Sequence, residues 1–215
     1  MKFLYGTARA FSNIFSPLLM ATYGVALAMT LSFLCLIPLD IRLTVIAETF
    51  LVTAAIPIIA IFLLYKFHVI TDPKLNDRTD RTWPYIIETA CFLGLAVYFY
   101  FIKAPLWLSL FLMGGAVALI ILTIVNRWWK ISGHATGMGA LCGMVFYLMV
   151  SGNSLYNLQW PFIFVCLLAG CVCTSRLILE RHTLGQVAAG FITGFTCVFL
   201  AAYLLQATPM PIPVK

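Results

Sequence analysis

Long apolar runs separated by short polar segments dominate this sequence. Seven of these runs are candidate membrane-spanning helices, at residues 17–37, 43–65, 85–102, 105–125, 135–150, 160–175 and 183–205. Because a helix needs roughly 17–25 residues to cross about 30 Å of hydrocarbon, the fifth and sixth runs require flanking residues to reach across. The pattern predicts an all-α, polytopic transmembrane helix bundle of about 7 spans, with 6 as the alternative, in a single integral membrane domain over residues 1–215.

The composition excludes an ordinary soluble domain. Hydrophobic residues make up 63% of the 215 residues and charged residues only 9%, whereas soluble domains carry about 25% charged residues. The net charge of +6 does not indicate nucleic acid, because the basic residues lie between apolar runs, where they face headgroups or an anionic ligand. We therefore expect membrane lipids as partners and no nucleic acid, and the sequence specifies no oligomeric state.

Two further features concern the ends and interiors of the spans. The stretch before residue 17 combines basic and aromatic residues and is typical of an interfacial helix. Glu48 and Glu88 lie inside expected spans and are functional candidates because burying a carboxylate is costly; a paired structural role is the alternative. The tryptophans lie near expected span ends, which predicts positions at headgroup level: Trp83, Trp107, Trp128, Trp129 and Trp160.

Polar side chains gather in three segments, at residues 74–84, 129–134 and 175–186. The first follows the second expected span, the second follows the fourth, and the third follows the sixth. Since two spans separate each segment from the next, the chain returns to the same face each time. The sequence therefore predicts that all three segments meet at one membrane surface.

These segments offer the groups that bind a tetrahedral oxyanion such as phosphate. Lys74, Arg81 and Arg176 are cations, and Ser132 and the backbone of Gly133 supply further hydrogen-bond donors. The alternative for each basic residue is a topological anchor at a span end.

Two histidines accompany these groups. His134 and His182 titrate near neutral pH, so one can attack phosphorus or take a proton while the other protonates the leaving oxygen. Gln186 follows His182 by four residues and shares its helix face. Its carbonyl oxygen can accept a hydrogen bond from one ring nitrogen and orient the other. A purely structural histidine is the alternative.

The three segments resemble the signature of the type 2 phosphatidic acid phosphatase superfamily, which reads Lys-x6-Arg-Pro, Pro-Ser-Gly-His and Ser-Arg-x5-His-x3-Asp. The resemblance covers residues 70–190, which we interpret as a phosphatase-like motif region. It implies removal of phosphate from lipid phosphates or diphosphates without a metal or other cofactor. It also implies His182 as the nucleophile that forms a phosphohistidine and His134 as the proton donor to the leaving oxygen. The phosphate ligands that it implies are Lys74, Arg81, Ser132, Gly133 and Arg176.

The sequence departs from this signature at three positions. Thr82 follows Arg81 in place of proline, Ile131 replaces the proline of the second part, and Gln186 stands where the signature has Asp. A neutral amide orients a histidine but stabilises its positive charge less than a carboxylate does. A catalytically weakened protein that only binds lipid phosphate is therefore one alternative function.

A second alternative comes from Asn76, Asp77 and Asp80, whose spacing resembles the Asn-Asp-x-x-Asp motif of intramembrane prenyltransferases. In those enzymes carboxylates hold magnesium on a diphosphate. A transporter or structural membrane protein is a third reading.

Basic residues also bear on orientation. Ten lie on the side of the three polar segments and three on the other, and without the three expected phosphate ligands seven still oppose three. The positive-inside rule places the segments in the cytoplasm, whereas the resemblance implies the outer, periplasmic face of a bacterial inner membrane.

Overall fold

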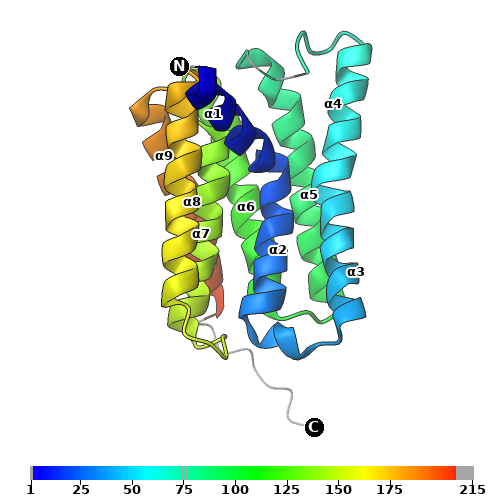
Figure 1. Ribbon diagram of the computed structural model, residues 1–215. Helices are drawn as coiled ribbons and strands as arrows, with labels where there is room; N and C mark the ends of the chain where they lie inside the picture. Colours follow the sequence, from blue (N-terminus) through cyan, green and yellow to red (C-terminus); the bar gives the residue numbers. More distant parts are fainter. Residues whose placement is uncertain (1, 74, 76, 207–215) are drawn as a thin grey trace.

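The computed structural model describes residues 2–73, 75 and 77–206, which form helices and no strands (Figure 1). The all-α prediction is therefore confirmed. The α-helices are α1 (Lys2–Ile14), α2 (Met20–Leu31), α3 (Leu39–Phe50), α4 (Ile56–Lys66), α5 (Thr82–Phe101), α6 (Leu106–Val125), α7 (Gly133–Ser151), α8 (Gln159–Ile178) and α9 (Leu184–Gln206). Short 3-10 turns occur at Pro17–Leu19, Phe33–Leu36 and Thr79–Arg81, and a π-helical turn at Leu51–Ala55 joins α3 to α4.

Among the described residues, seven helical segments are long and apolar enough to span a membrane, as the sequence predicts. They are Phe3–Leu31, Leu39–Lys66, Thr79–Phe101, Leu106–Val125, Gly133–Ser151, Gln159–Ile178 and Leu184–Leu204. The fifth and sixth recruit flanking residues, as expected. The first departs most from its predicted bounds, because Ser32 is extended and its hydroxyl oxygen accepts a hydrogen bond from the Leu34 amide, which ends the helix.

Helices α7 and α9 pack almost backbone to backbone. Glycines four residues apart line the contact on each helix, Gly139 and Gly143 on α7 and Gly190 and Gly194 on α9. A Cβ atom added at Gly143 would lie 2.6 Å from the carbonyl oxygen of Phe195, so a larger residue does not fit there. Small residues at this spacing let membrane helices approach closely. The contact sets the start of α7 beside the start of α9.

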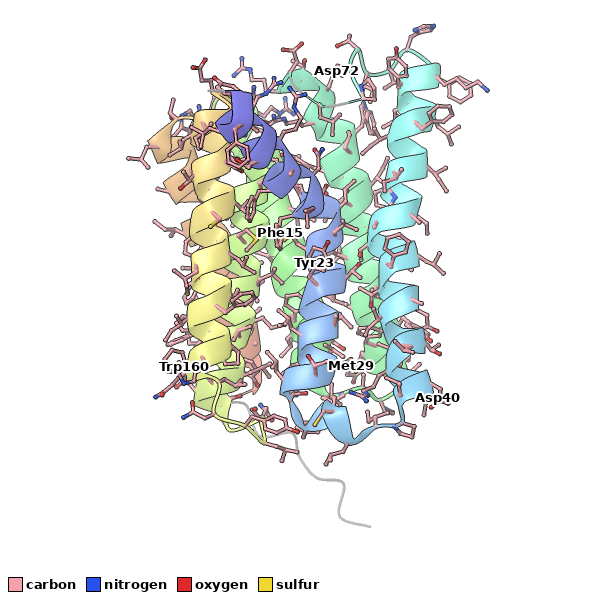
Figure 2. All side chains as sticks on the ribbon, viewed as in Figure 1. Phe15, Tyr23, Met29, Asp40, Asp72 and Trp160 are labelled. Carbon is pink, nitrogen blue, oxygen red and sulfur yellow. The ribbon has the colours of Figure 1, made fainter. Side chains whose placement is uncertain are left out.

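The labelled residues in Figure 2 distinguish the two ends of the bundle. Asp72 lies at the end near the N-terminus, whereas Asp40 and Trp160 lie at the opposite end (Figure 2). Helix α1 runs obliquely across the first of these ends (Figure 1) and packs against α8.

The tryptophans differ in exposure, although all five lie near span ends. Trp107 is 2% exposed and packs against the rings of Phe33 and Tyr147. These two rings cover it inside the bundle, at the start of the span Leu106–Val125. Trp83, Trp128 and Trp160 are exposed.

Candidate functional site

A single pocket brings together residues from all three polar segments. The pocket has a cavity volume of about 210 Å³. Its wall contains Arg81 from the first segment, Gly133 and His134 from the second, and Arg176 and His182 from the third. The prediction that these segments meet at one face is thereby confirmed. Lys74, the remaining predicted cation, lies outside the described residues.

The ring of His182 is held through Nδ1. This nitrogen lies 3.1 Å from the backbone oxygen of Lys130 and 3.2 Å from Oε1 of Gln186. Both neighbours are acceptors, so Nδ1 carries the hydrogen and Nε2 keeps its lone pair. The contact with Gln186 is the one that the four-residue spacing predicts.

The electrostatic environment keeps this ring neutral. Burial, reinforced by the positive charges of Arg81 and Arg176, lowers the pKa of His182 to about 4. At neutral pH the ring is therefore neutral, with its one hydrogen on Nδ1.

The amide of Gln186 is fixed by the start of α9. Its Oε1 accepts a hydrogen bond of 3.2 Å from the backbone N–H of Thr183, and the backbone N–H of Gln186 donates to Oγ1 of Thr183 over 3.5 Å. This reciprocal pair is a capping box. Because a backbone donor faces it, the side-chain atom at that position must be the oxygen, which is also the atom that orients His182.

The start of α7 opens on the pocket. Ser132 is fully buried, and its Oγ accepts from the N–H of Ala135 over 3.4 Å, so it caps the helix. Its own N–H donates to the backbone oxygen of Gln186 over 3.2 Å. Gly133 and His134 follow as the first helical residues and line the pocket. A helix N-terminus is a favourable place for an anion. Ser132 itself is not part of the pocket wall, so its direct contact with phosphate stays a prediction.

His134 and Arg176 are both tied to Ser12 of α1. Nε2 of His134 lies 3.0 Å from the backbone oxygen of Ser12, which makes Nε2 the protonated nitrogen of the neutral ring. Nη1 of Arg176 donates to Oγ of Ser12 over 3.0 Å. Nε of Arg176 is buried and has no hydrogen-bond partner. An unsatisfied buried guanidinium donor is costly, and a bound anion would satisfy it.

Arg81 is positioned by the loop that precedes α5. It is 8% exposed, and its Nε donates to the backbone oxygen of Leu75 over 2.9 Å. Asp80 holds the same loop, because its Oδ2 accepts from the N–H and hydroxyl of Thr71 and from the N–H of Asp72, at 2.7–3.1 Å.

These bonds account for Asp80 as a loop-stabilising residue rather than a magnesium ligand. Asn76, another member of the prenyltransferase-like motif, lies outside the described residues, and among the residues that the structure does describe no group of three His, Cys, Asp or Glu side chains could hold a metal.

Sequence reasoning missed three residues at this site: Ser12, Tyr85 and Arg181. Tyr85 and Arg181 line the pocket. Tyr85 follows Arg81 by four residues, so the helical spacing was a usable signal. Ser12 had no such signal, because its bonds join it to residues 122 and 164 positions away.

Comparison with known proteins gives one match. Residues 126–209 match the family model of the PAP2 superfamily. This stretch contains the second and third polar segments, whereas the first polar segment lies outside it. No curated protein and no solved structure matches the chain.

Proposed function

We propose that this chain is an integral membrane phosphatase acting on lipid phosphates. The basis is the match of residues 126–209, which makes the chain a member of the type 2 phosphatidic acid phosphatase (PAP2) superfamily. Its reaction is the hydrolysis of a phosphomonoester or diphosphate on a lipid, without a metal. The observation that carries the proposal is His182, a neutral imidazole with Nδ1 fixed and Nε2 free, in the wall of a pocket that also holds three arginines.

In the first half of the reaction, Nε2 of His182 attacks phosphorus and the bond from phosphorus to the lipid oxygen breaks. His134 delivers a proton to that oxygen, which leaves as the lipid alcohol or phosphate. The attacking ring becomes a cationic phosphohistidine, and the Gln186 oxygen at Nδ1 offsets part of this charge.

In the second half, His134 takes a proton from water as the water oxygen attacks the phosphohistidine. The bond between Nε2 and phosphorus breaks, and inorganic phosphate leaves. His134 donates through Nε2 to Ser12 in the resting site. Proton delivery to the substrate therefore requires either a second proton on Nδ1 or the release of Nε2 from Ser12.

Charge stabilisation comes from three directions. Arg81 enters the pocket from the 3-10 turn before α5, Arg176 from α8, and the N-terminus of α7 enters through Gly133. The unpartnered Nε of Arg176 is a donor for a phosphoryl oxygen. We assign Lys74 and Ser132 to the same phosphate by resemblance alone.

A lipid substrate fits the position of the pocket. Leu18 and Ile61, from two membrane-spanning segments, line it beside the arginines. A ligand bound there places its phosphate among cations and its apolar part against the bundle. We further propose that this end of the bundle faces the cytoplasm, following the excess of basic residues; labelling of a single engineered cysteine at residue 72 from either side of the membrane tests this orientation.

The test of the function is phosphate release by purified protein in detergent with EDTA, over a panel of lipid mono- and diphosphates. His182→Ala should abolish release. His68→Ala is the matched control, because His68 is exposed in a loop and does not line the pocket. Equal release by wild type and His182→Ala would reject the phosphatase.

The second candidate is a protein that binds lipid phosphate without hydrolysing it, which Gln186 favours because it gives the nucleophile no carboxylate partner. Binding of a lipid phosphate that survives His182→Ala, together with no phosphate release by wild type, would establish this alternative. A requirement for magnesium would instead favour the prenyltransferase-like motif.

A further inference from the structure

Glu88 of α5 lies at the boundary between two pockets. One is the phosphate pocket described above. The second, here called the apolar pocket, lies deeper in the bundle and has a cavity volume of about 50 Å³. Pro17, Tyr85, Glu88 and Gly133 line both pockets, so the two are adjoining parts of one internal space.

The apolar pocket has the character of a hydrocarbon site. Its wall is formed by α2, α5, α6 and α7 and is mostly aliphatic or aromatic, with Met20, Phe92, Phe111 and Leu119 among its residues. Its small cavity and apolar lining fit the first part of a hydrocarbon chain rather than a whole ligand.

Glu88 is a buried side chain on the wall of both pockets. The side chain is 4% exposed, and within the described part of the chain it makes no hydrogen bond or ion pair. Glu48, the other carboxylate inside a span, instead accepts a hydrogen bond of 3.3 Å from the hydroxyl of Tyr98. Because an unpartnered buried carboxyl is costly in any charge state, the environment of Glu88 lacks a group that a ligand can supply.

The position of Glu88 relative to Arg81 defines where the partner group of Glu88 would lie in a bound ligand. Glu88 follows Arg81 by seven residues, which is two helical turns on one face and about 10 Å along the helix axis. A phosphate held by Arg81 would therefore have Glu88 beside the atoms that follow it, before the chain enters the apolar pocket.

We propose, as a deepening of the proposed function on which it rests, that Glu88 binds a hydrogen-bond-donating group of the substrate. The substrate class is then a lipid phosphate with a hydroxyl or ammonium group close to the phosphate and a hydrocarbon chain that continues into the apolar pocket. Glu88 is a specificity-determining residue, and phosphate binding itself is left to the arginines.

The experiment uses three alkyl phosphates with the same chain: unsubstituted, 2-hydroxy and 2-amino. For wild type, kcat/KM should be at least about tenfold higher for both donor-bearing phosphates than for the unsubstituted one, a difference of about 1.4 kcal/mol. Glu88→Leu should remove both preferences. Glu88→Gln should keep the hydroxyl preference and lose the additional preference for the ammonium group.

Glu48→Gln and Glu48→Leu are the matched controls and should leave both ratios unchanged, because Glu48 lines neither pocket. Equal kcat/KM values for the three phosphates in wild type, or ratios that survive Glu88→Leu, would overturn the inference. If Glu88→Leu does not fold, Glu88→Gln serves as the test. A preference for the 2-amino phosphate that is retained in Glu88→Gln would also overturn the inference.

A binding measurement separates this inference from the proposed function. Thermal unfolding is measured for His182→Ala and for the double variant His182→Ala/Glu88→Gln, each with each of the three phosphates. A larger rise in Tm with the 2-amino phosphate, lost on Glu88→Gln, supports the role of Glu88 even if wild type releases no phosphate. Identical shifts for all three phosphates contradict it even if wild type is an active phosphatase.

Discussion

The backbone oxygen of Ser12 lies 3.0 Å from Nε2 of His134, although the two residues are 122 positions apart. Ser12 also accepts a hydrogen bond from Arg176 through its hydroxyl. Helix α1, which lies outside the region matched by the family model, thus contacts both the expected proton donor and an expected phosphate ligand. The N-terminal helix is therefore part of the site.

Replacement of Ser12 should weaken substrate binding more than turnover. Ser12→Ala removes the hydroxyl from Arg176 and leaves the backbone oxygen to His134, so KM should rise by about three- to tenfold with little change in kcat, as for loss of one hydrogen bond to a charged group. Ser12→Thr should restore KM, and Asn13→Ala, at an exposed neighbour, is the control. Steady-state kinetics on one lipid phosphate measure both constants, and an unaltered KM in Ser12→Ala would count against the role.

The acid limb of the pH profile should lie well below neutrality. The reactive form of His182 is the neutral ring, and its pKa is lowered to about 4 by burial and by Arg81 and Arg176. Activity that depends on this ring should persist as the pH falls from 7 to 5 and decline as it falls through about 4. The measurement is kcat/KM against pH, and a half-maximal value near the ordinary histidine pKa of about 6.5 would contradict the assignment.

A carboxylate at position 186 should move the acid limb of the pH profile to higher pH. Gln186→Glu keeps the capping-box geometry and places a negative charge beside Nδ1, which raises the pKa of His182. Gln186→Asp restores the residue of the superfamily signature, and we expect it to preserve or raise turnover at neutral pH. The same profiles measure both variants, and complete loss of activity in Gln186→Asp would show that the glutamine has a different role.

Whether the sequence predicts a contact at this site depends on how far apart its two residues lie along the chain. The seven spans follow from the length of the apolar runs, and the meeting of the three polar segments follows from the even number of crossings between them. The contact between His182 and Gln186 follows from their spacing on one helix. These are local or parity properties, so one sequence contains them.

The rest depends on contacts between distant segments. The bond between Ser12 and His134 requires knowing that α1 lies across the site, and the burial of Trp107 requires knowing that Phe33 and Tyr147 cover it. Glu88 was recognised as unusual, but its place between two pockets is set by four helices. The glycine spacing in α7 and α9 was visible in the sequence and had not been used.

Substitution of Thr183 distinguishes the helix-capping role of Gln186 from its contact with His182. Thr183→Val removes the hydroxyl that accepts from the Gln186 N–H and leaves the contact between Gln186 and His182 in place. Loss of a helix cap costs about 1 kcal/mol, so Tm should fall while the pH profile keeps its shape. Gln186→Leu should lower Tm comparably and also reduce kcat by about tenfold or more, because Nδ1 keeps the Lys130 oxygen but loses the Gln186 oxygen that offsets the charge of the phosphorylated ring. Equal effects of the two variants on kcat would indicate that Gln186 acts only as a cap.

The close packing of α7 and α9 should be a requirement for the site as well as for the fold. At Gly194 an added Cβ would overlap the backbone oxygen of Thr136, whereas at Gly94 it would meet no atom within 4 Å. Gly194→Ala must push the helices apart, and this would also separate His134 at the start of α7 from His182 beside the start of α9. We expect a destabilisation of about 1–3 kcal/mol, as for overpacking, with loss of activity in the fraction that remains folded. Gly94→Ala, on a helix surface without neighbours, should be neutral or slightly stabilising. Tm and specific activity measured on both proteins decide the question: activity retained in Gly194→Ala would mean that the two histidines do not depend on this helix contact for their relative position.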